Sequence, residues 1–457
     1  MCLSMTLTKK TINLLKEHSA LIVILVGVAL VAFTVGPFQT LDTQLELDTT
    51  RSILRVGYPI LPSTGQILNE PPIGFYTAAV VLKIFGLTIS NGTNMVTLFG
   101  VGCVIMVFFL GKEFYGKLTA LFASVSFAFA PWQMILSRAF LIDTQCLFLS
   151  LICLYFGVKA IKSNSTKLTL ISGIFFAAAI LTKLYAAFIL LPLLILYFYR
   201  HPRSVKRALS QFAVFCAPAI YANLLWYVFI LKEDLLSYFL YHNDFRDLNF
   251  ATVAPSYSFV FNFLVNNGVG ILAILALGFS LLIGLQFRKA LPKNFLLSDA
   301  ICFVSMLFII GINMFLGVTL NLKAPYTSAI KFSYQALPFI ALIVGSLAEK
   351  SIILIDRTRN SLRLKQGFML AMIVVGIFLT FSSMVMNMYS AHHLSTTTYI
   401  VFQVQPGQDI GYSFYVDSPA YLGIEQWAAQ ILGFAFVWIG LAGTLKSQFS
   451  SKPVSKI

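Results

Sequence analysis

A few charged side chains interrupt the long apolar runs of this 457-residue chain, and they are the first candidates for chemistry. Ionisable groups at membrane depth are costly to bury and usually serve a function. Asp42, Glu46 and Asp48 follow the first apolar run. A carboxylate there suits a general base or a ligand of a divalent metal, and a solvated acidic loop is the simpler alternative.

Further candidates lie later in the chain. Lys183 interrupts the apolar stretch AILTKLYAAF, where it needs an anionic partner or water unless it snorkels as a structural lysine. Arg138 and Asp143 belong to SRAFLIDTQ, for which an interface anchor and a helix cap are the structural alternatives. Two later segments contain His242 with Arg246, and Lys331 with Tyr334.

Glu70 stands in NEPPIGFY, directly before two prolines and an apolar helical run. The prolines stop any preceding helix, and the run after them predicts a new one. Acids near the first apolar run and cations from later segments would together suit an acceptor hydroxyl and a phosphate leaving group that meet at a membrane surface.

The composition predicts the elements that must position these groups. Hydrophobic residues make up 58% of the chain and charged residues 11%, and the mean hydropathy is +0.85. A soluble protein has about 25% charged residues. We therefore predict an all-α polytopic membrane protein with about 12 (11–13) transmembrane helices. The crossings are expected near residues 19–37, 94–110, 118–135, 142–158, 168–182, 185–199, 210–231, 262–286, 300–320, 332–348, 366–388 and 430–445.

The net charge of +15 is explained by membrane topology. Most Lys and Arg residues fall in alternate short connections, which the positive-inside rule places in the cytoplasm together with both termini. The longer connections, at 38–93, 232–261 and 389–429, then lie outside, where loops carry functional groups on a rigid scaffold. We expect one membrane domain over 1–457 in the plasma membrane, with an extracytoplasmic active site and no nucleic-acid partner.

Residues 72–89 are long enough to cross a membrane, but a crossing here would invert the charge bias of the later connections. We therefore predict a helix lying in the outer interface within the catalytic first outer loop, with Lys83 snorkelling to the headgroups. A full crossing is the alternative.

Several signatures are absent from the sequence. There is no P-loop, no GxGxxG opening a βα unit, no HExxH and no GxSxG, so nucleotide-driven chemistry on the cytoplasmic side is not expected. The 6 cysteines form no CxxC, and we expect them to pack within helices. No small-residue cleavage site follows the first apolar run, which is therefore expected to remain as the first helix.

The order of these features resembles the GT-C glycosyltransferases that use polyprenyl-phosphate sugars, such as the protein O-mannosyltransferases and the lipid A aminoarabinose transferases. In that family an Asp follows helix 1 some way before a Gly that begins an extended stretch, as Asp42 precedes Gly57. A Pro-Pro step and an apolar helix ending in FG come next, as in NEPPIGFY and LKIFG. The later elements SR…D, LTK, HN..R and K..Y…P are matched at Arg138 and Asp143, Leu181-Thr182-Lys183, His242, Asn243 and Arg246, and Lys331, Tyr334 and Pro338.

The resemblance covers about residues 20–345 and implies transfer of a single sugar from a polyprenyl (dolichyl-type) monophosphate to an acceptor hydroxyl outside the cytoplasm. The acceptor would be a protein, lipid or glycan, and one direct displacement would invert the anomeric centre. Asp42 would act as the general base, and Asp143 would orient a cation or the sugar. The phosphate or the substrate would contact Arg138, Lys183, Arg246, Lys331, Tyr334, His242 and Glu70.

Two departures from the family pattern change these expectations. Thr43 replaces the usual Glu after the Asp, which weakens a metal-binding carboxylate pair, so no cofactor is assigned and a divalent metal at Asp42, Glu46 and Asp48 is left open. Glu70 replaces the Lys or His before Pro-Pro, where it could contact the sugar or pair with a cation. The alternatives are a non-catalytic transporter or flippase for lipid-linked sugars and an inactive scaffold subunit.

Overall fold

The computed structural model of the chain describes residues 41–60, 67, 70–128, 133, 136–200, 204–230, 293–320 and 333–357. These residues are mostly helical, with one isolated antiparallel bridge between Ile60 and Ile67. The prediction of a helical protein is confirmed for this part of the chain, whereas the total of about 12 crossings stays a prediction. The crossings expected near 19–37, 262–286, 366–388 and 430–445 lie outside the described residues.

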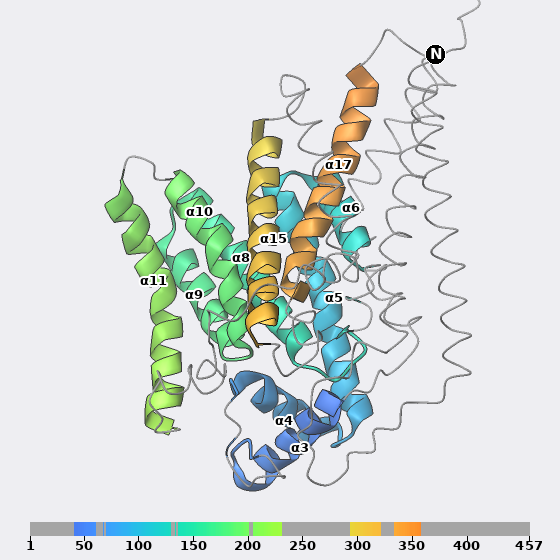
Figure 1. The fold of residues 1–457 in the computed structure, drawn as a ribbon, viewed down its shortest axis with the longest axis vertical. Coiled ribbons are helices and arrows are strands. Elements are labelled where there is room, and N and C mark those ends of the chain that lie inside the picture. The colour runs from blue at the N-terminus through green and yellow to red at the C-terminus, as the bar shows by residue number, and fades with distance from the viewer. Residues whose placement is uncertain are drawn as a thin grey trace, which may run out of the picture.

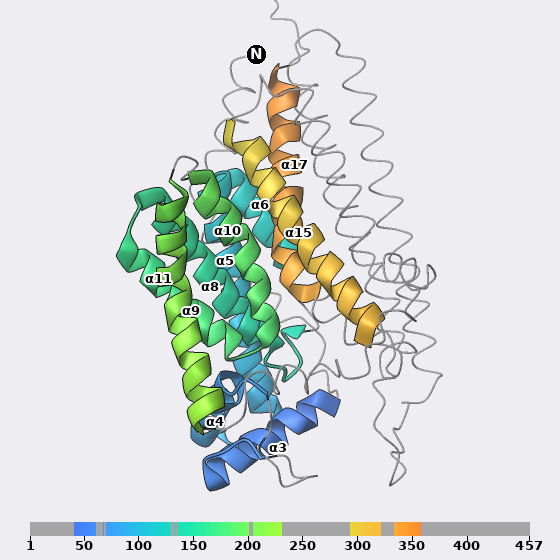
Figure 2. The ribbon, with the colours of Figure 1, turned by 60° about the vertical axis from the view of Figure 1, so that its left-hand side comes forward.

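Most of the described helices form a bundle, and two others lie together across one of its ends (Figures 1 and 2). The bundle contains α5 (Ile89–Phe114), α6 (Lys117–Ala128), α8 (Asp143–Ser163), α9 (Thr166–Ile180), α10 (Leu190–Arg200), α11 (Val205–Leu224), α15 (Lys293–Leu320) and α17 (Leu337–Arg357). The helices at its end are α3 (Leu41–Val56) and α4 (Ile73–Phe85). Short turns of helix named η1 (Leu184–Ile189) and η4 (Ser333–Ala336) lead into α10 and α17, and η2 (Leu225–Ile230) continues α11 as a π-helix.

Length and composition show which of the described helices could span a membrane. Ile89–Phe114, Asp143–Ser163 and Val205–Val228 are long and apolar enough to cross a membrane. At 1.5 Å per residue α5 is about 39 Å long, which exceeds the roughly 30 Å hydrocarbon core. The 13 residues of α4 reach only about 20 Å. This length favours the interfacial placement over a full crossing, although the placement itself stays a prediction.

Polar residues mark the ends of the bundle helices. The Thr88 hydroxyl accepts a hydrogen bond from the Asn91 backbone N–H at 3.2 Å and caps the start of α5. Asn164 ends α8 in the left-handed conformation with φ of 54°, which asparagine tolerates better than most residues. Ser165 then caps α9 by accepting from Leu168 N–H at 3.4 Å. These caps explain why two helices follow each other here with only a short connection.

Helices α9 and α11 pack closely because a glycine lies between them. A Cβ atom on Gly173 would stand 2.3 Å from the carbonyl oxygen of Phe215, so no larger residue fits without moving α11. Beside this contact the rings of Phe176 and Phe215 stack with centroids 4.9 Å apart. Both rings belong to the main hydrophobic core of the bundle.

Helix α3 occupies a segment that the sequence led us to treat as part of a loop. Its Thr-rich sequence carries no long apolar run, so hydropathy alone does not predict it. Glu46, Leu47, Thr50 and Ile53 are nevertheless buried at helical spacing, and this face packs on α4. The Thr50 hydroxyl donates to the Glu46 carbonyl at 2.7 Å, which keeps that polar side chain satisfied inside the contact.

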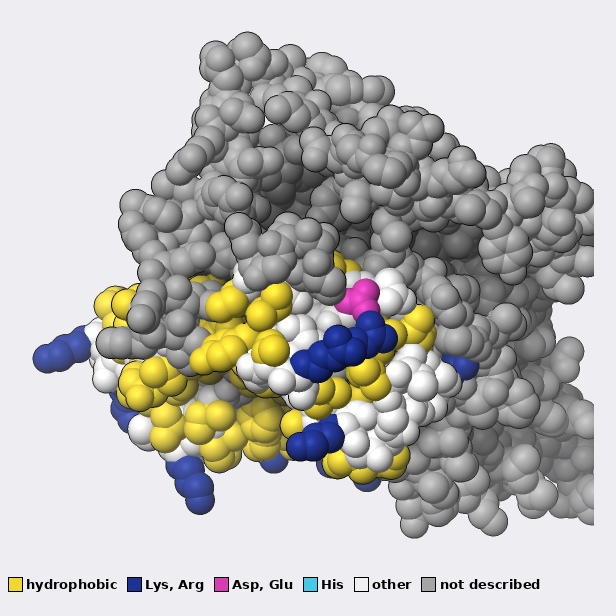
Figure 3. Space-filling view, turned by 90° about the horizontal axis from the view of Figure 1, so that it is seen from below, with side chains coloured by type: hydrophobic (Ala, Val, Ile, Leu, Met, Phe, Trp, Pro, Cys, Tyr) yellow, Lys and Arg dark blue, Asp and Glu magenta, His cyan; other side chains and the backbone are white. Residues whose placement is uncertain are grey.

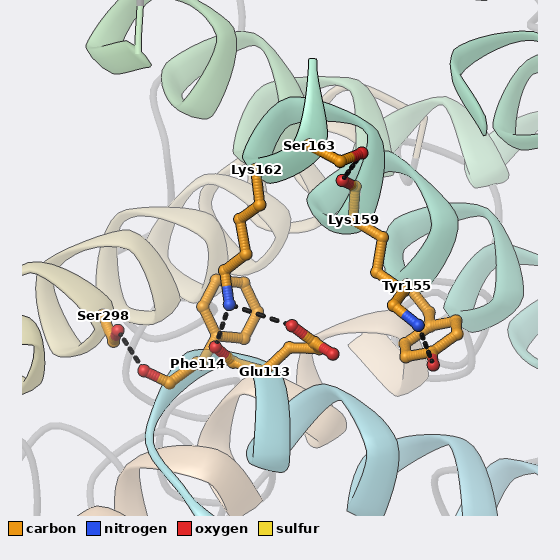
Figure 4. A network of polar contacts seen from close by, with 7 residues as sticks. All are labelled: Glu113, Phe114, Tyr155, Lys159, Lys162, Ser163 and Ser298. Atoms are coloured by element: carbon orange, nitrogen blue, oxygen red, sulfur yellow. Dashed lines mark hydrogen bonds and ion pairs between the residues drawn. The ribbon is translucent and has the colours of Figure 1, made fainter. Parts of the chain in front are cut away.

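The end of the bundle where α5 turns into α6, here called the α5–α6 end, is fixed by polar contacts between helices (Figure 4). Lys162 on α8 forms an ion pair with Glu113 on α5, with Nζ and Oε2 2.9 Å apart. On α15 the Ser298 hydroxyl donates to the Phe114 carbonyl at 2.9 Å. These contacts tie the last turn of α5 to two neighbouring helices.

A second ion pair lies deeper at the same end. Lys350 on α17 and Asp299 on α15 form it, and neither side chain is exposed. The Tyr115 hydroxyl donates to Asp299 Oδ1 at 2.9 Å. The crossing predicted at 332–348 corresponds to α17, which continues to Arg357 and carries the buried Lys350.

Candidate active site

The candidate site lies at the opposite end of the bundle, where α3, the start of α8 and the turn between α9 and η1 meet. We call this the α3–α4 end. Buried Glu46 on α3 accepts a hydrogen bond from the backbone N–H of Ile142 at 3.1 Å. Because Ile142 directly precedes α8, this carboxylate caps the helix from another element, where the helix dipole favours negative charge.

Asp143 opens α8 and is almost completely buried. Its Oδ1 accepts a hydrogen bond from the hydroxyl of Tyr185 at 2.6 Å. A hydrogen bond to a carboxylate is shorter and stronger than one between neutral groups. Tyr185 lies in η1, so the contact holds the start of α8 against the segment that also carries Lys183.

Lys183 stands between α9 and η1 and pairs with Glu70, with Nζ and Oε2 3.0 Å apart. The lysine side chain is 16% exposed and the glutamate 28%. A backbone hydrogen bond of 2.8 Å from Ile73 N–H to the Leu181 carbonyl joins the same two segments. Glu70 is therefore the anionic partner that Lys183 needs. Pairing with a cation was one of the two roles expected for Glu70 from the sequence, and Lys183 is that cation.

The electrostatic surroundings of Lys183 are dominated by acids. Burial alone would lower the pKa of its ammonium group, but the carboxylates of Glu70, Asp143 and Glu46 outweigh burial and raise that pKa above its ordinary value. Lys183 is therefore charged at neutral pH. The described part of the site brings three carboxylates from separate segments within electrostatic reach of this one ammonium group.

Arg138 is half-buried in the turn that leads into α8. Both sides of this turn are anchored. Thr97 on α5 donates to the Ser137 carbonyl at 2.8 Å, and Thr144 donates to the Leu136 carbonyl at 2.9 Å. Arg138 and Asp143 thus do not share a helix, because the first belongs to the turn and the second begins α8.

The acids of α3 have different partners. Asp48 accepts from Gln44 Nε2 at 3.0 Å and pairs with Arg51, whereas Glu46 binds the backbone before α8. Asp42 is the second residue of α3, one turn before Glu46, and the structure describes its backbone alone. Within the described residues no group of three His, Cys, Asp or Glu side chains could hold a metal ion.

The late segment also reaches the start of α8. Tyr334 in η4 is buried, and its hydroxyl donates to Gln133 Oε1. The next residue, Gln335, donates through Nε2 to the sulfur of Cys146 in the first turns of α8 at 3.6 Å. Tyr334 therefore lies close to the start of α8. His242, Arg246 and Lys331 lie outside the described residues.

Tyr185 is the residue at this site that sequence reasoning missed. Tyrosines are common in the apolar runs of this chain, which has 19 of them, so residue type alone gives no warning. Its position two residues after Lys183 is the signal that was available, because a short turn keeps neighbouring residues near the same site.

The surface at the α3–α4 end combines apolar and basic side chains (Figure 3). Exposed apolar residues include Val80, Ile84 and Phe85 of α4, and the basic residues Arg55 and Lys83 are exposed beside them. Such a surface suits the boundary between lipid tails and headgroups. The site behind it is therefore well placed for a substrate that has a lipid tail and a polar head.

Comparisons with known proteins show similarity in sequence and in fold. Residues 69–226 match the family described as dolichyl-phosphate-mannose-protein mannosyltransferase. Over 171 residues the chain is 26% identical to the putative mannosyltransferase YkcB of Bacillus subtilis. That alignment covers 36% of this chain and 23% of the relative, so most of the relative's length has no counterpart in it.

Two solved structures share the fold. ArnT from Cupriavidus metallidurans, solved with undecaprenyl phosphate bound, matches with a TM-score of 0.52 and 14% identity over 95% of this chain and 78% of that one. Arabinosyltransferase EmbB from Mycobacterium smegmatis matches with a TM-score of 0.50 and 13% identity, over 95% of this chain and 41% of that one. The chain therefore shares the fold of these two proteins, which agrees with the resemblance of its sequence to the GT-C glycosyltransferases.

Proposed function

We propose that this protein is a glycosyltransferase that moves a single sugar from a polyprenyl monophosphate to an acceptor hydroxyl. The observation that carries the proposal is the meeting of Glu46, Glu70, Asp143 and Lys183 at the α3–α4 end of a GT-C fold. Glu70 and Lys183 are 113 positions apart in the chain, yet the four residues form one polar cluster next to an apolar and basic surface.

The chemistry requires a base for the acceptor and cations for the leaving phosphate. Asp42 takes the proton of the acceptor hydroxyl as that oxygen attacks the anomeric carbon, and the bond to the phosphate oxygen breaks. Fixed cations stabilise the charge that develops on the phosphate. Lys183 and Arg138 supply two of them, and Arg246 and Lys331 supply the others. Asp143, held by Tyr185, orients the sugar or a cation.

We place the α3–α4 end on the extracytoplasmic side of the plasma membrane. The connections at the opposite end carry the exposed cations Lys112, Lys117, Lys162, Lys167, Lys206 and Arg207. The positive-inside rule puts such connections in the cytoplasm. In intact cells a membrane-impermeant thiol reagent should label Arg55→Cys and leave Lys162→Cys unlabelled, and the reverse pattern would reject this orientation.

The experiment that tests the activity supplies the purified protein with polyprenyl monophosphates carrying different single sugars and measures transfer or release of the sugar. Asp42→Asn should lower turnover about 100-fold or more, because general base catalysis contributes roughly 10²–10⁴-fold. Asp48→Asn is the matched control, since Asp48 lies on the same helix but pairs with Arg51. Equal turnover in wild type and Asp42→Asn would reject Asp42 as the base.

The same assay separates the alternative functions. A flippase would move the lipid-linked sugar across a proteoliposome membrane without breaking the sugar–phosphate bond. A scaffold subunit would do neither by itself. Sugar transfer by the purified protein alone would exclude both alternatives.

A further inference from the structure

The pairing of Lys183 with Glu70 has a consequence for ligand binding. Lys183 offers a single compact ammonium group, and in this structure that group already contacts a carboxylate at 3.0 Å. A phosphate oxygen that binds Lys183 needs the same donor. Phosphate binding and the Glu70 contact therefore compete for one cation.

We propose that Glu70 weakens phosphate binding by acting as an internal substitute for the phosphate group. Its carboxylate occupies Lys183 while the site is empty, is displaced when a lipid monophosphate arrives, and takes the lysine back when the product phosphate leaves. This inference rests on the proposed function, because it concerns the same lipid phosphate.

The surroundings of the Lys183–Glu70 ion pair keep its two groups close together but allow the contact to break. The Ile73–Leu181 backbone hydrogen bond fixes the segments that carry the two charged groups, so the carboxylate stays near the lysine after the contact breaks. The side chains are partly exposed, at 16% and 28%, so water can solvate either charge during the exchange. A fully enclosed pair such as Lys350–Asp299 lacks this freedom.

Glu46 and Asp143 already accept hydrogen bonds from other groups, so they are less suited than Glu70 to substitute for the phosphate at Lys183. Glu46 accepts from the Ile142 backbone and Asp143 accepts from the Tyr185 hydroxyl. Both carboxylates also raise the pKa of Lys183, but less than Glu70 does. Among these three acids, Glu70 is the one with a direct ion pair to the lysine.

The size of the effect follows from the fraction of time that Lys183 is available. If Glu70 holds the lysine about nine-tenths of the time, the apparent affinity for a phosphate is about tenfold weaker than it would be without Glu70. Glu70→Gln should therefore bind undecaprenyl phosphate about tenfold more tightly than wild type. Inhibition of sugar transfer by this product should strengthen by the same factor.

The test measures binding of undecaprenyl phosphate to the purified full chain and to its variants. Glu113→Gln is the matched control, because Glu113 also pairs with a lysine, at 2.9 Å, but at the other end of the bundle. It should leave the affinity unchanged. Glu70→Asp, which keeps the charge but withdraws it by one methylene, should give an intermediate affinity and covers the case in which Glu70→Gln folds poorly.

A double-mutant cycle shows whether Glu70 acts through Lys183. In a Lys183→Gln background, Glu70→Gln should no longer raise the affinity. If it raises the affinity as much there as in wild type, general charge removal explains the effect and the inference is overturned. An unchanged or weaker affinity of Glu70→Gln in the presence of Lys183 overturns it as well.

Failure of the inference and failure of the proposed function give different results. If the wild-type protein transfers sugar and binds undecaprenyl phosphate, and Glu70→Gln binds it equally well, the proposed function stands and the competition between Glu70 and phosphate is rejected. A wild-type protein that neither binds the lipid phosphate nor transfers sugar loses both.

Discussion

Two lysine–carboxylate pairs stand at opposite ends of the bundle and differ in how completely they are enclosed. Lys350 and Asp299 are fully buried, and Tyr115 adds a hydrogen bond to the aspartate. Lys183 and Glu70 are partly exposed, and two further carboxylates act on the lysine from nearby segments. The first pair joins two helices of the bundle, whereas the second lies where helices, turns and an apolar surface meet.

The difference indicates what each pair is for. A buried pair whose partners cannot separate holds its helices in one arrangement, and breaking it leaves an uncompensated charge. A partly exposed pair contributes little to stability, because water screens it, but its members can exchange partners. The enclosed pair therefore suits a role in holding the fold, and the partly exposed pair suits the ligand-binding role that we propose for the α3–α4 end.

The largest effect is expected at the enclosed pair. Lys350→Met leaves Asp299 inside the bundle without its cation, which should cost about 3–5 kcal/mol of stability. Thermal unfolding of the purified protein in detergent measures the loss, and the folded fraction should keep its turnover. Adding Asp299→Leu should recover much of the stability, because an apolar pair of suitable size replaces the ion pair. A Lys350→Met protein as stable as wild type would contradict a structural role.

At the Lys183–Glu70 pair we expect a large effect on activity and a small effect on stability. Lys183→Gln should lower sugar transfer about 100-fold, as expected when one group that stabilises developing charge is removed. Its unfolding free energy should change by less than about 1 kcal/mol, because the pair is partly exposed. Rate and stability must be measured on the same preparation. A variant that unfolds easily but retains turnover while folded would make Lys183 a structural lysine.

A smaller effect is expected at Tyr185. Tyr185→Phe removes the hydroxyl that donates to Asp143 but keeps the ring in the core. The turnover number should fall about tenfold, which corresponds to about 1.4 kcal/mol, a size typical of a hydrogen bond to a charged group. In an Asp143→Asn background the same change should have little further effect. Additive losses would show that Tyr185 does not act through Asp143.

The sequence predicted most helix positions in the described residues because apolar runs dominate them. The run expected at 142–158 is α8, Asp143–Ser163, and that at 168–182 is α9, Thr166–Ile180. Helix α3 was not predicted, since its burial depends on alternating small polar and apolar residues that pack on α4. The extent of α17 was underestimated because Lys350 finds its partner 51 positions away.

For the candidate site, the sequence indicated the polar residues but not their contacts. Glu70, Asp143 and Lys183 were recognisable because each interrupts or borders an apolar run. The pairing of Glu70 with Lys183 spans 113 positions and depends on how α4 docks beside the end of α9, which no local pattern encodes. The role of Asp42 stays a prediction.

The stereochemistry of transfer tests the account most directly. The purified protein is supplied with a polyprenyl monophosphate sugar of known anomeric configuration and an acceptor alcohol, and the configuration of the product is determined by NMR. One displacement with Asp42 as the base predicts a product of inverted configuration from wild type and from Asp48→Asn, with almost none from Asp42→Asn. A product of retained configuration, or no product from the wild-type protein with any donor sugar, would contradict it.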